Sequence, residues 1–195
     1  MSTRIETLVD VQLTHRNRKT VFWRGVLVVP IGVFFSSFYQ MIHMASWSTP
    51  MITFPAFLAL VFRAAYPSYV LTINHALMEL STRIAAYLTL LTDDYPSIER
   101  NPNIAVIFPD IDGGKKLNRW LPLVKWLLAI PLYLVGIIYL ILSALLTFYA
   151  WIVTSITGNY PESAGKVVLG TVDFWNRVYG YAVVLVSDEY PSFNL

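Results

Sequence analysis

Two acid–arginine pairs are the best candidates for a functional site in this sequence. Glu79 precedes Arg83 by four residues, and Asp173 precedes Arg177 by the same interval. With the acid first, this spacing places both charges of a pair on one face of a helix, where they attract each other. Such a pair can neutralise charge beside an apolar surface, or it can form a polar site for a lipid headgroup, an ion or a partner. We expect the structural role and keep binding as the functional alternative.

The remaining polar residues form no recognisable catalytic or metal-binding set. His75 and Glu79 have the spacing of two metal ligands on a helix, but a metal site normally needs three or four. The acidic run FPDIDGGKK lacks the other ligands of a calcium loop. The sequence has no cysteine, no G-x-S-x-G motif and no P-loop. We therefore predict that the protein is not an enzyme and holds no metal or cofactor.

The composition is that of a membrane protein. Of the 195 residues, 56% are hydrophobic and only 13% are charged, whereas soluble domains carry about 25% charged residues. A net charge of +2, without basic runs interleaved with aromatic residues, argues against nucleic acid as a partner. Residues 1–19 carry charges throughout and show no signal-peptide pattern, so we expect them to stay uncleaved.

Two long blocks, residues 25–62 and 126–161, contain no Asp, Glu, Lys or Arg. As one helix the second block would be about 54 Å long, against about 30 Å for the hydrocarbon core of a bilayer. We therefore predict a helical hairpin in each block, at about 21–65 and 120–158, with tips near 46–50 and Ser143. Pro50 and Pro55 support a break in the first block. One long tilted span and a shallow wedge within one leaflet remain alternatives.

The chain reads as two tandem repeats, 1–97 and 98–195. The same residues and short motifs recur in the same order in both halves. A chance similarity in apolar composition would not produce this shared order. A one-residue shift near the end of the second half predicts that its last helix bulges or ends differently. The matched positions are Arg24 with Lys125, Pro30 with Pro131, Tyr66-Pro67 with Tyr160-Pro161, Glu79, Arg83 and Tyr87 with Asp173, Arg177 and Tyr181, and DDYPS (93–97) with DEYPS (188–192).

Each block leads into an amphipathic helix, predicted at about 68–91 and 163–186. Its polar stripe and apolar remainder are typical of a helix that lies at the membrane interface or packs on the hairpins. We interpret the four Tyr-Pro steps as helix boundaries with tyrosine at headgroup depth. Two short extended segments, LVDVQL (8–13) and IAVIF (104–108), precede the blocks, and we predict that they pair as a two-stranded ribbon on the cytoplasmic face.

The second half resembles a bacterial membrane-protein family known as domain of unknown function 4389. The resemblance rests on LNRWLPLVKWLLAIPLYLVG, TGNYP, an Arg-Val-x-x-Tyr helix and SDEYPSF, over residues 117–193. The first half, 16–97, departs from this resemblance, because it lacks the LVKW motif and has FRAAYP in place of TGNYP. The resemblance supports the architecture and carries no established activity.

The predicted fold is therefore an all-α integral membrane protein of two hairpin-plus-interfacial-helix repeats with short cytoplasmic extended segments. If both blocks are hairpins, every charge lies on one side of the membrane. The preference of Lys and Arg for the cytoplasm then gives a multi-pass protein of the cell membrane with both termini cytoplasmic.

The predicted function is non-catalytic: binding lipid, or serving as an accessory or assembly subunit of a larger membrane complex. The predicted partners are membrane lipids and either a membrane protein or further copies of the chain. Membrane shaping is the alternative, because short hairpins followed by amphipathic helices have the layout of curvature-generating proteins such as reticulons. A transporter or channel component is a weaker third hypothesis, since neither apolar block contains a charge to line a route.

Overall fold

Helices dominate the computed structural model of this protein, which describes residues 4–43, 52–99 and 101–195. A 3₁₀ turn at Asp112–Gly114 precedes the second apolar block, and a π-helical turn at Gly180–Val184 follows the last α-helix. The other elements in chain order are β1 (Glu6–Val9), α1 (Arg18–Leu27), α2 (Val29–His43), α3 (Phe54–Arg63), α4 (Ser68–Leu88), β2 (Ile104–Ile107), α5 (Pro122–Leu128), α6 (Ile130–Thr157) and α7 (Glu162–Tyr179).

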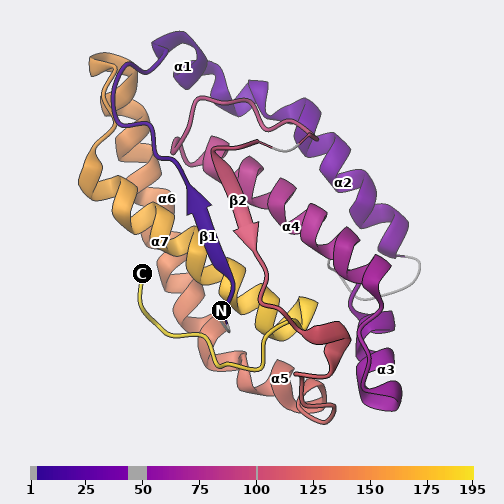
Figure 1. The fold of residues 1–195 in the computed structure, drawn as a ribbon. Coiled ribbons are helices and arrows are strands. Elements are labelled where there is room, and N and C mark those ends of the chain that lie inside the picture. Colours follow the sequence, from indigo (N-terminus) through magenta and orange to yellow (C-terminus); the bar gives the residue numbers. More distant parts are fainter. Residues whose placement is uncertain (1–3, 44–51, 100) are drawn as a thin grey trace.

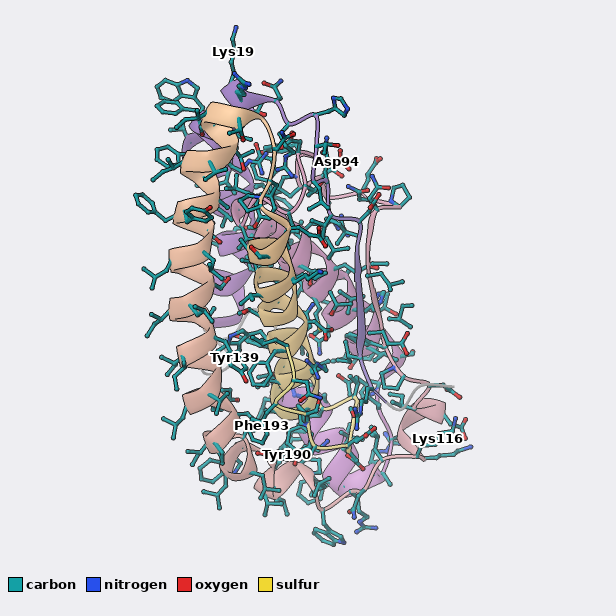
Figure 2. All side chains as sticks on the ribbon, turned by 90° about the vertical axis from the view of Figure 1, so that its left-hand side faces the viewer. Lys19, Asp94, Lys116, Tyr139, Tyr190 and Phe193 are labelled. Carbon is teal, nitrogen blue, oxygen red and sulfur yellow. The ribbon has the colours of Figure 1, made fainter. Side chains whose placement is uncertain are left out.

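The elements stack in three layers (Figures 1 and 2). Helices α1, α2 and α6 form one outer layer, α4 and α7 lie in the middle, and the ribbon of β1 and β2 covers the opposite side. Buried apolar side chains fill the space between the layers, such as Met78 of α4 against Val106 of β2. On the other side of the middle layer, Phe174 of α7 packs against Leu132 of α6. The middle helices therefore have neighbours on both faces.

The hairpin predicted for residues 120–158 is wrong. A single helix, α6, runs without a break from Ile130 to Thr157, and Ser143 lies in its middle. The physical reason is visible in the sequence: no proline or glycine occurs between residues 137 and 157 to interrupt the helix. It ends where Gly158 adopts a left-handed conformation with φ of 76°. The segment is apolar enough to cross a membrane once.

The first block also contains one long apolar helical stretch. Residues Arg18–Phe38, across α1 and α2, are long and apolar enough to cross a membrane. Helices α1 and α2 are separated only at Val28, two residues before Pro30, and α5 and α6 are separated only at Ala129, two residues before Pro131. The tip predicted at 46–50 lies outside the described residues. Helix α3 follows it and ends at Arg63, and the next residue, Ala64, adopts a left-handed conformation.

The two predicted amphipathic helices are present but shorter than expected. The predicted 68–91 is α4, which ends at Leu88, and the predicted 163–186 is α7, which ends at Tyr179. The irregularity expected at the end of the second half is the π-helical turn, which accommodates one extra residue. After each helix a leucine takes a left-handed backbone conformation, Leu90 in the first half and Leu185 in the second.

The predicted pairing of the two extended segments is confirmed for Leu8 and Val9 of the first segment and Ile104–Ile107 of the second, while the position of the ribbon on the cytoplasmic face stays a prediction. Strands β1 and β2 pair antiparallel, with Thr7 opposite Val106. The pairing begins two residues earlier than the LVDVQL run and is extended by a hydrogen bond from the Asp10 amide to the Asn103 carbonyl, at 2.9 Å. The ribbon joins the two halves of the chain, because β1 packs on α7 and β2 packs on α4.

The long helices of the two halves run in opposite directions (Figure 1). The start of α1 meets the end of α6, where Arg18 donates to the Thr157 carbonyl at 3.1 Å. In the middle layer, Thr82 of α4 and Asn176 of α7 are matched positions of the two halves, and they hydrogen-bond to each other at 3.0 Å. This pair of matched positions therefore lies where α4 and α7 are in contact.

Candidate functional site

Both predicted acid–arginine pairs form ion pairs. In α4 the Arg83 guanidinium lies 3.4 Å from the Glu79 carboxylate, and in α7 the Arg177 guanidinium lies 3.1 Å from that of Asp173. The Arg83 side chain is buried, whereas that of Asp173 is partly exposed. Among the described residues, no hydrogen bond or ion pair joins the two pairs, so they do not converge on one site.

Each of these arginines also holds the chain segment that follows the next Tyr-Pro step. Arg83 donates to the Ser97 carbonyl at 2.7 Å and to the Glu99 carbonyl. Arg177 donates to the Ser192 hydroxyl at 2.6 Å and to the Asn194 carbonyl at 2.7 Å. Donors spent on backbone and hydroxyl oxygens are not free for a ligand. The contacts favour the structural role that we expected for these pairs.

His75 is likewise engaged within the fold. Its Nε2 atom lies 2.7 Å from the Val106 carbonyl and 3.9 Å from the Glu79 carboxylate. Within the described part of the chain, no group of three or more His, Asp or Glu side chains is placed to hold a metal ion.

Three charged side chains at one end of the molecule form a cluster that the sequence patterns did not predict. Arg16 and Arg24 share the carboxylate of Asp93, with Arg16 at 2.8 Å, and both arginines are buried. The Arg24 guanidinium lies over the ring of Tyr87, 4.3 Å from its centroid. Arg24 also donates to the Thr92 carbonyl at 2.8 Å. Two cations therefore share one carboxylate at this end of the molecule.

The opposite end carries the matching arrangement with one cation fewer. The Lys125 ammonium is 2.7 Å from the Asp188 carboxylate and 2.7 Å from the Ser187 carbonyl. It lies 5.1 Å from the centroid of the Tyr181 ring. The available signal was the recurrence of a cation, a tyrosine and an acidic DYPS or EYPS motif in both halves. The sequence did not show that the cation, the tyrosine ring and the acidic residue lie in contact in the fold.

Burial sets the electrostatics of both clusters. Desolvation lowers the pKa of the Arg16 guanidinium, and the Asp93 carboxylate partly offsets this effect. Desolvation likewise lowers the pKa of Lys125, against the opposing effect of Asp188. A buried cation is tolerated only with a close counter-charge and hydrogen bonds, and both clusters provide these. They fix the ends of the apolar helices to the segments that follow α4 and α7.

Two of the four Tyr-Pro tyrosines are buried in the protein, which corrects the assignment of Tyr66 and Tyr160 to headgroup depth. The Tyr66 hydroxyl donates to the Val184 carbonyl at 2.7 Å, and the Tyr160 hydroxyl donates to the Thr89 carbonyl at 3.1 Å. Each tyrosine thus bonds the end of the other half's amphipathic helix. Burial raises the pKa of both phenols to about 12.

Large apolar side chains are exposed all along the outer helical layer. Helix α6 has no charged residue and is mostly exposed, with Leu145 at 65% and Phe148 at 62%. Monomeric soluble proteins rarely expose an apolar patch of this extent. The outer-layer residues that make this apolar face are Phe22, Trp23, Val26, Leu27, Val29 and Val33 of α1 and α2, Trp126 and Leu127 of α5, and Leu134, Ile137, Ile138, Ile141, Leu145, Phe148, Tyr149, Ile152 and Ile156 of α6.

A groove opens in this apolar face between α1/α2 and α6. It consists of two cavities, of about 540 and 340 Å³, that share Thr89, Leu140 and Ser143 in their linings. Helices α4 and α7 supply residues from the middle layer to its floor, among them Thr82 and Asn176. Among the sites described above, the groove alone is both a cavity and open to the apolar face.

No family model, curated protein or solved structure matches this chain. The resemblance to the family of domain of unknown function 4389 therefore stays a prediction.

Proposed function

We propose that this protein is a non-catalytic integral membrane protein that binds lipid through the apolar face of α1, α2, α5 and α6. The observation that carries the proposal is the two-sided character of the fold. Leu145 is 65% exposed on α6, a helix without charged residues, whereas Glu6 of β1 and Asp10 just after it are exposed. Helix α6 and the ribbon lie on opposite sides of the molecule (Figure 2). Membership of the family it resembles is part of this proposal.

The ribbon argues against a single copy that crosses the bilayer with all its sides in lipid. Strands β1 and β2 lie level with the middle of α6 on the far side of α4 and α7, and the two-stranded ribbon has open edges (Figures 1 and 2). Unpaired backbone groups and open sheet edges are not found in the hydrocarbon region of a membrane. A lone copy therefore lies with its apolar face in one leaflet and its ribbon in water, the wedge arrangement. Both termini and the basic segments are then on the cytoplasmic side.

Membrane shaping is the second candidate, and the same asymmetry favours it. Material inserted into only one leaflet expands that leaflet relative to the other. The pure protein added to liposomes is then expected to draw out tubules, and unchanged vesicles at high protein-to-lipid ratio would contradict the shaping function.

Two surface lysines test the arrangement. Lys19 and Lys116 are exposed at opposite ends of the long helices (Figure 2), and the chain has no native cysteine to interfere. In intact cells and in inverted vesicles, Lys19→Cys and Lys116→Cys are treated with a membrane-impermeant maleimide. The wedge arrangement predicts that both react from the cytoplasmic side only.

Reaction of the two positions from opposite sides would refute the wedge and show that the long helices cross. In that case the ribbon needs a cover at membrane depth, which a second copy or a partner subunit supplies, and the accessory-subunit function is favoured. If neither variant fractionates with membranes, the membrane function itself is wrong.

A further inference from the structure

The groove between α1/α2 and α6 is formed by the divergence of the two apolar helices. They are in contact near one end, where the rings of Phe22 and Trp151 stack at 5.7 Å, and they separate toward the other end (Figure 1). The middle-layer helices α4 and α7 close the bottom of the gap. Because the two cavities share lining residues, the groove is continuous along the Leu140–Trp151 part of α6.

The walls of the groove are mainly apolar. Phe22, Phe148 and Trp151 line one end, and Phe35 and Trp175 line the other. Leu140 of α6 borders both cavities and is half exposed on the apolar face. The groove is therefore open to whatever covers that face. The charged residue Arg24 also lines one end, where its guanidinium is held by Asp93 and the Thr92 carbonyl.

The hydroxyl groups on the floor do not call for a polar ligand. Ser81, Thr89 and Thr171 each donate to a carbonyl of their own helix, at 2.8, 2.7 and 2.9 Å. Thr82 and Asn176 bond to each other. Two further lining residues, Thr147 and Trp175, each carry a polar atom without a hydrogen-bond partner among the described residues, Oγ1 and Nε1, and both atoms are already buried within the protein. An apolar chain that lies on the floor therefore takes no donor away from a partner.

We propose that the groove binds one acyl chain of a membrane phospholipid, inserted between α1/α2 and α6 against α4 and α7. This inference rests on the proposed function, because the apolar face must lie in the membrane for a lipid chain to reach the groove. A mainly apolar groove that opens sideways into the hydrocarbon region fits a flexible hydrocarbon chain. The chain covers floor residues that the outer helices leave uncovered.

A photoactivatable lipid can map the occupant. The full-length protein is reconstituted in liposomes that contain a phosphatidylcholine with a diazirine in one acyl chain, irradiated, and analysed by peptide mass spectrometry. We expect labelled peptides from α6 and also from the floor, in particular from the Ser81–Thr89 part of α4. The floor peptides are diagnostic, since α4 is not part of the apolar face.

Two phenylalanine substitutions supply the matched comparison. Ala144 lines the groove from an exposed position on α6, so Ala144→Phe fills the groove without disturbing the core. Leu145→Phe adds an aromatic ring to the next residue, which is 65% exposed. We expect Ala144→Phe to reduce floor labelling several-fold and Leu145→Phe to leave it unchanged, with equal labelling of the outer side of α6 in both.

The outcomes separate this inference from the function on which it rests. Labelling of α6 without labelling of α4 would overturn the groove proposal and leave the lipid-binding face intact. Absence of label from the whole protein would overturn the proposed function as well.

Discussion

At the scale of residues, the cations at the ends of the apolar helices are the most demanding feature of the fold. Arg24 and Lys125 are both buried and each faces one carboxylate. Removing the carboxylate leaves a desolvated positive charge, which costs more than the pair contributes when intact. Asp188 is the clearer place to test this destabilisation, because it pairs with one cation, whereas Asp93 pairs with two.

Asp188→Asn is expected to lower the free energy of unfolding by roughly 2–4 kcal/mol, because Lys125 stays buried without a counter-charge. The partial exposure of Asp188, 26%, keeps the expected cost toward the lower end. The measurement is denaturant unfolding of the protein in detergent micelles. Adding Lys125→Met to this variant removes the stranded charge and should restore part of the loss. The exposed Asp112→Asn is the matched control, and an equal loss there would contradict the argument.

The buried phenols of Tyr66 and Tyr160 predict an alkaline limit to stability. Their pKa is raised by burial to about 12 in the folded protein, from 10.0 in the unfolded chain. Below pH 10 both states keep the proton and the contribution is complete. As the pH rises from 10 to 12, only the unfolded chain loses its proton, so stability falls, by up to about 2–3 kcal/mol for each phenol.

Replacing both tyrosines by phenylalanine should flatten this part of the pH profile, although each loses a hydrogen bond worth about 1 kcal/mol at neutral pH. Unfolding is measured between pH 8 and 11.5. Tyr69→Phe, at an exposed position, should keep the slope of the original protein. A double variant with the unchanged slope would mean that other groups govern alkaline unfolding.

At the scale of elements, individual helices and strands can be predicted from the sequence better than the way they pack together. The period of the apolar residues predicts α4 and α7, and the two short extended runs predict the ribbon. The hairpin in residues 120–158 failed because length alone suggested two crossings, while the lack of any helix breaker between 137 and 157 pointed to one helix. The clusters around Arg24 and Lys125 depend on contacts between residues more than sixty positions apart, which a repeat can suggest but not place.

The single helix α6 can be tested directly by a distance measurement. Spin labels at Leu134→Cys and Ile156→Cys, both exposed, should lie about 33 Å apart along one helix, from a rise of about 1.5 Å per residue. A hairpin with its tip near Ser143 would bring them to about 10 Å, the spacing of packed helices. Double electron–electron resonance in liposomes distinguishes the two, and a short distance would restore the hairpin.

At the scale of the whole molecule, the apolar face and the ribbon face make opposite demands on their surroundings. The outer layer exposes more apolar surface than water tolerates, and the ribbon exposes strand edges that lipid does not tolerate. The two faces lie on opposite sides of the middle layer (Figure 2). A membrane boundary parallel to the layers satisfies both. A boundary across the layers satisfies both only if something else covers the ribbon.

The same chemical change on each face tells these arrangements apart. Leu145 of α6 and Leu8 of β1 are both exposed, at 65% and 54%. In the wedge arrangement Leu145→Lys places a charge in hydrocarbon and should reduce the liposome-bound fraction of the protein in flotation assays, at a cost of up to about 3 kcal/mol, or about a hundredfold in partition. Leu8→Lys faces water and should leave binding unchanged, or raise it slightly on anionic liposomes. An equal loss from both substitutions would mean that the ribbon face also meets lipid or a partner within the membrane, and the helices would then have to cross.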